Sequence, residues 1–211
     1  MAVEPDWEAR YRRMASSFAS ARRALRVLRY YSYLLPRHGL ALDLACGLGA
    51  NARLLASRGL EVYAWDSAAA AIDRLQALAA AEAVHVHAAV RDVVLQPPEP
   101  EQFDIIVVGY FLERSLVPAI IAGLRPGGLL YYQSWTVEAT DSEYGPRQRQ
   151  WCLEPGELLG LYARLTPLIY REEGGTGDCS RGLRGQAYLV ARKPRVPGDM
   201  IGRAGHADPA Q

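Results

Sequence analysis

Residues 40–52 have the sequence LALDLACGLGANA, in which a short apolar run passes directly into a glycine-rich turn and a helix-forming segment. An apolar run of this length, closed by glycine, predicts a buried strand. Gly47 and Gly49 predict a turn whose backbone a ligand can approach closely, beside the N–H groups at the start of the following helix. The stretch therefore predicts a strand–turn–helix unit with a ligand at the carboxyl end of the strand.

The same alternation continues along the chain. Strands are expected at 40–45, 61–65, 84–88, 103–108 and 129–135. Helices are expected at 52–58, 67–81, 113–124 and 155–163. Alternation at this spacing predicts parallel pairing with right-handed crossovers and helices on both faces. Two last strands, at 165–172 and 183–192, have no helix between them and should pair antiparallel. The predicted fold class is α/β: a doubly wound, Rossmann-like sheet of seven strands, mostly parallel with an antiparallel C-terminal strand.

The two ends of the chain are expected to differ from its centre. Apolar residues at helical spacing predict helices at 5–17 and 19–35, so residues 1–36 are expected to form an N-terminal helical cap. Residues 37–193 hold the predicted sheet and form the central domain. Residues 194–211 are rich in Gly, Pro and Ala, and are expected to be a disordered tail.

The composition restricts the expected partners and location. The 211 residues include 24 basic and 23 acidic side chains, which leaves a formal net charge of +1. This balance gives no electrostatic reason to expect nucleic acid or a membrane surface as a partner. No apolar run approaches the roughly 18 residues of a membrane span, and the three cysteines have no CxxC spacing. We therefore expect a cytoplasmic monomer or homodimer without a metal site.

Acidic residues follow three successive predicted strands. Asp43 lies close to the glycine turn, where a carboxylate suits a ligand with an ammonium or sulfonium group better than a pyrophosphate. Asp66 is placed to accept hydrogen bonds from two ribose hydroxyls, and Asp92 to accept one from an adenine amino group. Each has a structural alternative: Asp43 ties the glycine loop to itself, Asp66 caps the helix that begins at Ser67, and Asp92 forms a turn.

Beyond these residues, several motifs resemble successive motifs of class I S-adenosylmethionine-dependent methyltransferases. The matching segments are residues 43–51, 64–66, 91–92, 103–107 and 124–129. Within that superfamily the chain resembles the tellurite-resistance methyltransferase group and its small bacterial relatives, through residues 65–66, 114–118 and 153–158. It departs from that group at Ala50, where members often carry Arg, and at Gln133-Ser134, where they often carry a Glu-Thr pair. The resemblance implies S-adenosylmethionine as cofactor, bound by Asp43, Ala45, Gly47, Gly49, Asn51, Asp66, Ser67, Arg91, Asp92 and Val108.

Methyl transfer from a sulfonium needs no protein nucleophile, because the methyl group is already activated. The protein has to hold the acceptor in line with the S–CH₃ bond, exclude water and accept a proton where the acceptor requires it. Tyr110 and Arg114 are the catalytic candidates, and Trp135, Tyr144 and Arg147 the substrate-binding candidates. Individually each also fits a packing or surface role. Together they predict an aromatic and cationic pocket for a small anionic or soft acceptor, such as a thiol or a chalcogen oxyanion.

Two other functions remain open at this point. The segment from Gly47 to Ala52 also fits GxGxxA, the fingerprint of NAD-dependent oxidoreductases, although Asp43 and the antiparallel ending disfavour that class. A non-catalytic protein that binds S-adenosylmethionine would keep the same cofactor residues. A methyl-acceptor screen separates this last alternative from an enzyme.

Overall fold

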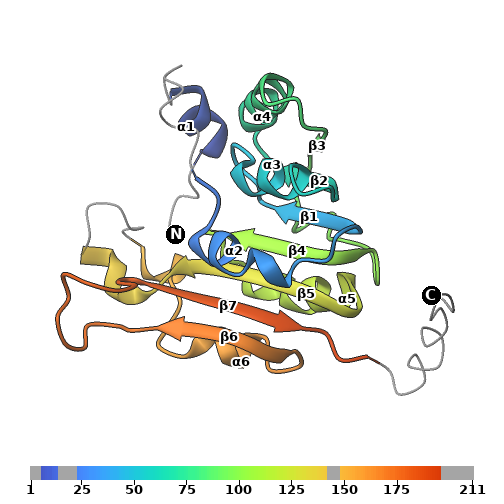
Figure 1. Cartoon of the computed structure of the whole chain (residues 1–211). Coiled ribbons are helices and arrows are strands. Elements are labelled where there is room, and N and C mark those ends of the chain that lie inside the picture. Colours follow the sequence, from blue (N-terminus) through green and yellow to red (C-terminus); the bar gives the residue numbers. More distant parts are fainter. Residues whose placement is uncertain (1–5, 14–22, 142–147, 196–211) are drawn as a thin grey trace, which may run out of the picture.

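The computed structural model describes residues 6–13, 23–141 and 148–195, and its centre is a seven-stranded sheet (Figure 1). The strands are β1 (Leu40–Leu44), β2 (Glu61–Asp66), β3 (His87–Val90), β4 (Phe103–Gly109), β5 (Leu124–Trp135), β6 (Thr166–Glu172) and β7 (Gln186–Arg192). Their order in the sheet is β3-β2-β1-β4-β5-β7-β6. The pairs from β3 to β5 are parallel, and β7 is antiparallel to both β5 and β6. The predicted fold class is confirmed.

Helices cover both faces of the sheet (Figure 1). The α-helices are α1 (Trp7–Arg13), α2 (Arg26–Tyr30), α3 (Ala50–Ala56), α4 (Ala69–Ala81), α5 (Val117–Gly123) and α6 (Glu157–Leu161). Short 3-10 turns are η2 (Ser32–Leu34), η3 (Arg114–Leu116), η4 (Val137–Asp141) and η5 (Arg149–Trp151). Buried residues of α2, α3 and α4 pack on one face, and those of α5 and α6 pack on the other.

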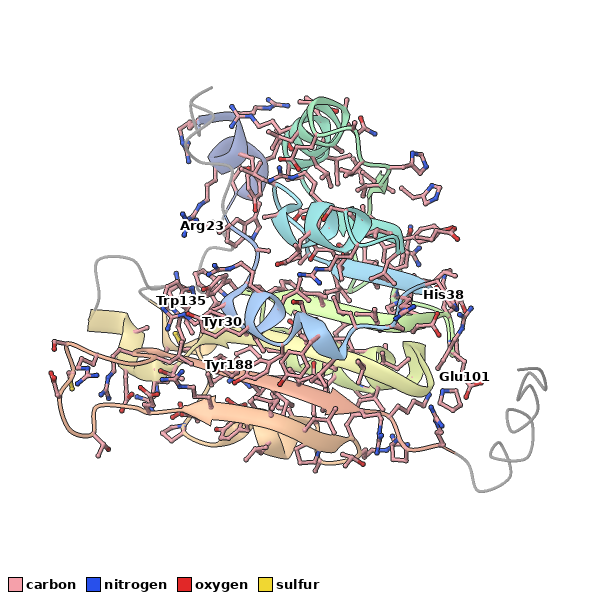
Figure 2. The ribbon with its side chains drawn as sticks, in the orientation of Figure 1. Arg23, Tyr30, His38, Glu101, Trp135 and Tyr188 are labelled. Atoms are coloured by element: carbon pink, nitrogen blue, oxygen red, sulfur yellow. The ribbon has the colours of Figure 1, made fainter. Side chains whose placement is uncertain are left out.

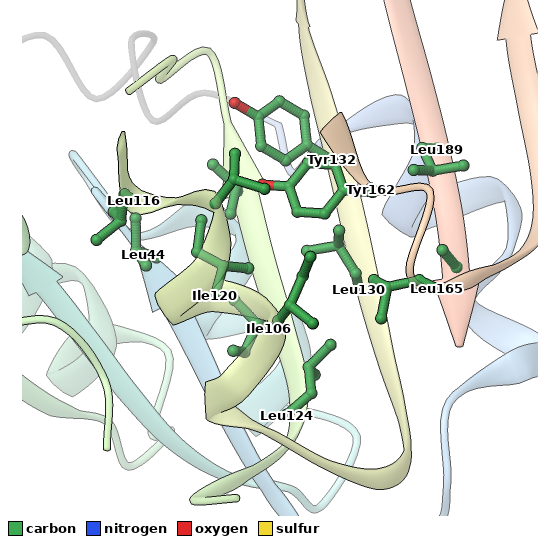
Figure 3. Packing of buried hydrophobic residues seen from close by; sticks show 14 of the residues in the cluster. Leu44, Ile106, Leu116, Ile120, Leu124, Leu130, Tyr132, Tyr162, Leu165 and Leu189 are labelled. Carbon is green, nitrogen blue, oxygen red and sulfur yellow. The ribbon is translucent and has the colours of Figure 1, made fainter. Parts of the chain in front are cut away.

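Alternation along the central strands produces these two cores, because successive side chains of a strand point to opposite faces. In β4, Ile105 and Val107 join the core under α2, α3 and α4, whereas Ile106 and Val108 join the core under α5 and α6. Figure 3 shows the second core, where Tyr132 and Tyr162 lie with their ring centroids 5.4 Å apart above the aliphatic residues. Since both faces are covered, β1 and β4 are apolar almost throughout.

Several element boundaries differ from the prediction. Strand β5 begins at Leu124 rather than at 129, because Gly127 and Gly128 continue the sheet edge through backbone hydrogen bonds with Lys193. Strand β3 occupies 87–90 rather than 84–88, with His87 opposite Tyr63 of β2. The turn signal of Pro126-Gly127-Gly128 misplaced the start of β5.

The helix expected at 19–35 is the largest local error. Of its described part, only Arg26–Tyr30 is α-helical, and Leu25 has extended backbone angles. The amide of Leu25 donates to the side chain of Asn51, and that of Val27 donates to the side chain of Gln133. These distant side chains replace the preceding helical turn as partners, so the helix begins late.

The topology places a ligand site at one edge of the sheet. The chain proceeds outward from β1 to β2 and β3 on one side, and from β4 to β5 on the other. In doubly wound sheets the crevice at this reversal, outside the carboxyl ends of the strands, is where ligands bind. Trp135 lies at this edge, while His38 and Glu101 lie at the opposite one (Figure 2). Within the described ranges, no helix is long and apolar enough to cross a membrane.

Candidate cofactor and acceptor site

The glycine turn after β1 takes left-handed backbone conformations at three positions. Ala45, Gly47 and Gly49 have φ values of 53°, 52° and 67°. A Cβ atom at Gly49 would lie 2.2 Å from a methyl carbon of Leu75, so this glycine permits close packing of α3 against α4. A Cβ atom at Gly47 would meet the hydroxyl of Tyr11, 2.6 Å away. The open side of Gly47 is therefore covered by a side chain of α1, not by backbone.

Asp66, at the end of β2, faces the glycine turn directly. Its Oδ2 accepts from the amide of Gly47 at 2.8 Å, and its Oδ1 accepts from the amide of Ala68 at 3.0 Å. Burial raises the pKa of Asp66, and these backbone hydrogen bonds partly oppose the rise. A carboxylate has about four acceptor positions, so two bonds from the chain leave capacity for ribose hydroxyls. Helix α4 begins at Ala69 after Ala68, so Ser67, which is exposed, does not cap it.

Asp43 is buried and holds the glycine turn to the following helix. Its Oδ1 accepts from Nδ2 of Asn51 at 3.1 Å, and its Oδ2 accepts from the amide of Ala52 at 3.0 Å. Burial raises the pKa of Asp43 to about 7, against the effect of both hydrogen bonds. The alternative in which Asp43 ties the loop to itself is thus present in the structure, and its contact with the cofactor stays a prediction.

The residues after β3 make a self-contained turn. Oδ1 of Asp92 accepts from the amides of Val94 and Leu95, at 2.9 and 3.2 Å. The guanidinium of Arg91 donates to two carbonyls of the same loop and lies 3.8 Å from the ring centroid of Trp65. Both side chains therefore have structural roles here, and the predicted contacts of Arg91 with the cofactor and of Asp92 with adenine stay predictions.

The ends of β1 and β4 are crossed by the segment that precedes α2. The amide of Leu25 donates to Oδ1 of Asn51 at 2.9 Å. A Cβ atom built on Gly109 would lie 2.9 Å from a methyl carbon of Leu25, so the Leu25 side chain packs directly on this glycine. Val108 is fully buried within β4, where it pairs with Leu44 of β1, and its contact with the cofactor stays a prediction. This segment separates the glycine turn from the residues after β4.

A polar and aromatic group lies at the carboxyl ends of β4 and β5. Tyr110 has a φ of 55°, a strained value for a residue with a side chain, and its ring centroid is 4.9 Å from that of Trp135. Its hydroxyl donates to Oε1 of Gln186 at 3.1 Å and accepts from Nε2 of Gln133 at 3.0 Å. The structure thus brings two predicted residues, Tyr110 and Trp135, together with two glutamines that were not predicted.

The hydrogen bonds of the Arg114 side chain go to the segment around α6. Its guanidinium forms a bidentate ion pair with Glu157, at 2.6 and 2.9 Å, and donates to the carbonyls of Gln150 and Cys152. The hydrogen bond with Glu157 raises the pKa of Arg114 and lowers that of Glu157. Arg114 therefore joins η3 to the segment before α6. The other two candidates, Tyr144 and Arg147, lie outside the described residues.

Helix α1 contacts the cofactor edge of the domain. Besides the approach of Tyr11 to Gly47, Oε2 of Glu8 accepts from the amide of Ala70 in the first turn of α4, at 3.1 Å. The same carboxylate pairs with Arg12 at 2.9 Å. These contacts could not be predicted from the sequence, because Glu8 and Ala70 are 62 positions apart and Tyr11 is likewise distant in the chain from Gly47.

Two surface cavities lie elsewhere. One of about 390 Å³ is lined by Glu101, Arg164 and Lys193 with neighbouring apolar residues, at the edge of the sheet opposite Trp135. One of about 210 Å³ lies between α6 and the strands β6 and β7. Neither borders the glycine turn or Tyr110. In the described part of the chain, no group of three or more His, Cys, Asp or Glu residues is placed to hold a metal ion.

Replacing Gly47 by Ala is expected to weaken cofactor binding at least about tenfold. The added Cβ would enter the space beside Tyr11, and the left-handed backbone would be strained by about 1 kcal/mol. Gly156→Ala is the matched control: its φ is 72°, and a Cβ there meets nothing within 4 Å. Calorimetry should show unchanged affinity in the control, with a similar loss of stability in both variants. Equal affinity in both would place the cofactor away from Gly47.

Replacing Arg114 by Met is expected to lower the free energy of unfolding by about 1 kcal/mol, because the ion pair with Glu157 is partly exposed. Arg149→Met removes a more exposed pair with Glu154 and should cost less. Urea unfolding measures both effects. Lost methyl transfer with unchanged stability would instead assign Arg114 to the reaction itself.

The comparisons with known proteins agree with this geometry. Residues 41–128 match a family model described as a methyltransferase domain. Hemagglutinin 1 of Eikenella corrodens is 38% identical over 143 residues, which cover 64% of this chain and 46% of that protein. The chain thus spans less than half the length of this relative.

Solved structures share the fold at low sequence identity. TehB from Haemophilus influenzae has a TM-score of 0.62 and 23% identity, covering 79% of this chain and 61% of that chain. A methyltransferase dependent on S-adenosylmethionine from Methanosarcina mazei has a TM-score of 0.64 and 17% identity, covering 83% of this chain and 100% of that chain. At these identities the likeness establishes the fold alone.

Proposed function

We propose that the chain binds S-adenosylmethionine and transfers its methyl group to a small-molecule acceptor by in-line displacement. The match of residues 41–128 to a family model described as a methyltransferase domain, and the fold shared with solved methyltransferases, support this proposal. The observation that carries the proposal is the pairing of the glycine turn with Asp66, whose carboxylate lies 2.8 Å from the amide of Gly47. We place the catalytic unit at residues 37–193, with the N-terminal segment as its cap.

The residues at this edge fit the cofactor. The backbone of Gly47 is approached by the side chain of Tyr11, which a ligand could displace without moving the sheet. Asp66 retains acceptor capacity for two hydroxyls, and Asp43 is a buried carboxyl near the turn whose charged form a cofactor ammonium would favour. Two carboxylates suit a cofactor with an ammonium and a sulfonium, and oppose the pyrophosphate of NAD.

Bound S-adenosylmethionine supplies an activated methyl group, so the chain's task is to orient the acceptor and exclude water. Leu25 lies across Gly109 and narrows the crevice at the switch point. Beyond it, Tyr110 and Trp135 offer an aromatic wall, and the glutamine amides around the Tyr110 hydroxyl do not take up a proton near neutral pH. These groups orient an acceptor rather than deprotonate it, which favours one that ionises by itself, such as a thiol or a chalcogen oxyanion.

Calorimetry with S-adenosylmethionine, S-adenosylhomocysteine and NAD tests the cofactor. The proposal expects micromolar binding of the two adenosyl compounds and none of NAD. A screen with radiolabelled cofactor then tests the acceptor, with 2-mercaptoethanol, selenite and tellurite as probes. Cofactor binding without transfer to any acceptor in a wider panel would favour the second candidate, a non-catalytic protein that binds S-adenosylmethionine.

A further inference from the structure

Gln133 is a buried polar side chain at the end of β5, and it makes three hydrogen bonds. Its Oε1 accepts from the amide of Val27 at 3.0 Å. Its Nε2 donates to the hydroxyl of Tyr110 at 3.0 Å and to Oε1 of Gln186 at 2.7 Å. Gln133 is 2% exposed, so its own end of each bond is shielded from water. Both N–H donors of the carboxamide are therefore committed, and so is its oxygen.

These three bonds join Gln133 to three separate parts of the chain. Val27 belongs to α2, Tyr110 follows β4, and Gln186 begins β7. Gln133 and Tyr110 are also joined through their backbones, because the amide of Tyr110 donates to the carbonyl of Gln133 at 2.8 Å. Gln133 thus fixes both the backbone and the hydroxyl of Tyr110, whose φ of 55° is otherwise unfavourable.

A second side-chain amide, that of Asn51, binds the same segment beside the glycine turn. Asn51, on α3 beside the glycine turn, accepts from the amide of Leu25. Leu25 and Val27 are two positions apart, so the segment that covers Gly109 is fastened by Asn51 at one point and by Gln133 at the next. The cofactor side and the acceptor side each hold this segment through a single side-chain oxygen.

We propose that Gln133 is a positioning residue of the acceptor site: its one carboxamide holds Val27 across the strand ends and orients the Tyr110 hydroxyl beside Trp135. The role of Gln133 in acceptor binding rests on the proposed function, whereas its hydrogen bonds to Val27 and Tyr110 do not. Gln133 contacts neither the glycine turn nor Asp66 through any hydrogen bond described above. It therefore acts on the acceptor and leaves the cofactor bound.

Two substitutions separate the two tasks of the carboxamide. Gln133→Glu keeps an oxygen that accepts from Val27 but loses the donors to Tyr110 and Gln186. Gln133→Met has a similar length and loses all three bonds. Gln150→Met is the matched control, since the Gln150 side chain is exposed and its bond is to Gln148. Circular dichroism establishes whether each variant is folded. If Gln133→Met does not fold, Gln133→Glu alone carries the test.

Three measurements test the inference without a known acceptor. Hydrogen exchange at the Val27 amide should rise at least tenfold in Gln133→Met and stay near the wild-type rate in Gln133→Glu. The ¹⁹F resonance of 5-fluorotryptophan at position 135, assigned with Trp135→Phe, should shift in both variants because the neighbouring Tyr110 ring moves. Affinity for S-adenosylhomocysteine should stay within threefold. The control should match the wild type in all three.

Kinetics complete the test once an acceptor from the thiol and oxyanion panel is turned over. Gln133→Met and Tyr110→Phe should each lower kcat/KM about tenfold or more. The double variant should have a kcat/KM no lower than that of the less active single variant, because both substitutions remove the same orientation of the Tyr110 hydroxyl. Gln133→Glu should add a pH inflection to kcat/KM that Gln133→Met lacks.

The outcomes distinguish two failures. Additive losses, an unmoved Trp135 resonance, or cofactor affinity that falls as far as turnover would overturn the role of Gln133. Absence of adenosyl-compound binding in the wild type would overturn the proposed function instead, and the exchange and resonance measurements would still decide whether Gln133 holds Val27 and Tyr110.

Discussion

Asp66→Asn is expected to lower the affinity for S-adenosylmethionine and S-adenosylhomocysteine by about ten- to a hundredfold, the usual cost of losing a charged hydrogen-bond acceptor. The carboxylate binds the amides of Gly47 and Ala68 at the same time. An amide has one oxygen in place of two, so one of these contacts is lost along with capacity for the ribose. Calorimetry measures the affinity of both compounds.

Asp92→Asn is the control for that experiment. It makes the same chemical change at an exposed carboxylate whose Oδ1 accepts two bonds within its own turn. The affinity of Asp92→Asn should fall by less than that of Asp66→Asn, because the asparagine keeps an oxygen that accepts, and the contact predicted for Asp92 is a single bond from the adenine amino group. If Asp92→Asn weakened binding while Asp66→Asn did not, the adenosyl group would lie along the β3 side of the crevice and the role assigned to Asp66 would be wrong. Thermal unfolding without ligand separates lost affinity from lost stability.

The second large effect is on stability as a function of pH. Burial raises the pKa of Asp43 to about 7, whereas an unfolded aspartate has a pKa of about 3.9. Between about pH 4 and pH 7 the folded state therefore holds a proton that the unfolded state has released, so the free energy of unfolding falls as pH rises through this window. At about 1.36 kcal/mol per pKa unit, the total is at most about 4 kcal/mol.

The variant Asp43→Asn isolates this contribution, because an amide does not titrate. Other carboxylates act in the opposite direction: the pKa of Glu157 is lowered by Arg114, so its contribution is lost as pH falls. Urea unfolding of both proteins from pH 5 to pH 8 should therefore show a difference between them that grows with pH and levels off above 7. A difference independent of pH would mean that Asp43 is ionised throughout.

The raised pKa of Asp43 also predicts that cofactor binding is coupled to release of a proton. A cofactor ammonium near Asp43 favours the charged carboxylate and lowers its pKa, so binding at pH 6 should release a proton. The binding enthalpy should then depend on the ionisation enthalpy of the buffer in the wild type but not in Asp43→Asn. Equal enthalpies in all buffers would mean that the cofactor does not approach Asp43.

The fold followed from the sequence because burial on both faces of β1 and β4 forces apolar runs, and the glycines mark the strand ends. The roles within the site were harder to predict, because they depend on hydrogen bonds between distant positions. The Asn51 contact spans 26 residues and the Gln133 contact spans 106. Gln133 departs from the residue common in the group that the chain resembles, but no local pattern shows that its carboxamide makes three hydrogen bonds. Arg114 is predicted near the acceptor because of its place after β4, and no local pattern shows that its guanidinium pairs with Glu157, 43 residues later.

The contacts of residues 25–31 also bear on the order in which the chain folds. Val27 requires Gln133, and the hydroxyl of Tyr131 donates to the carbonyl of Tyr31, so both partners lie in β5. Strand β5 in turn pairs with β7, and Tyr31 packs on Tyr188 of β7. During ribosomal synthesis this early segment emerges long before its docking surface. Loop closure over such separations is slow, so pulse-labelling should find Val27 protected later than the amides of β1 and β4.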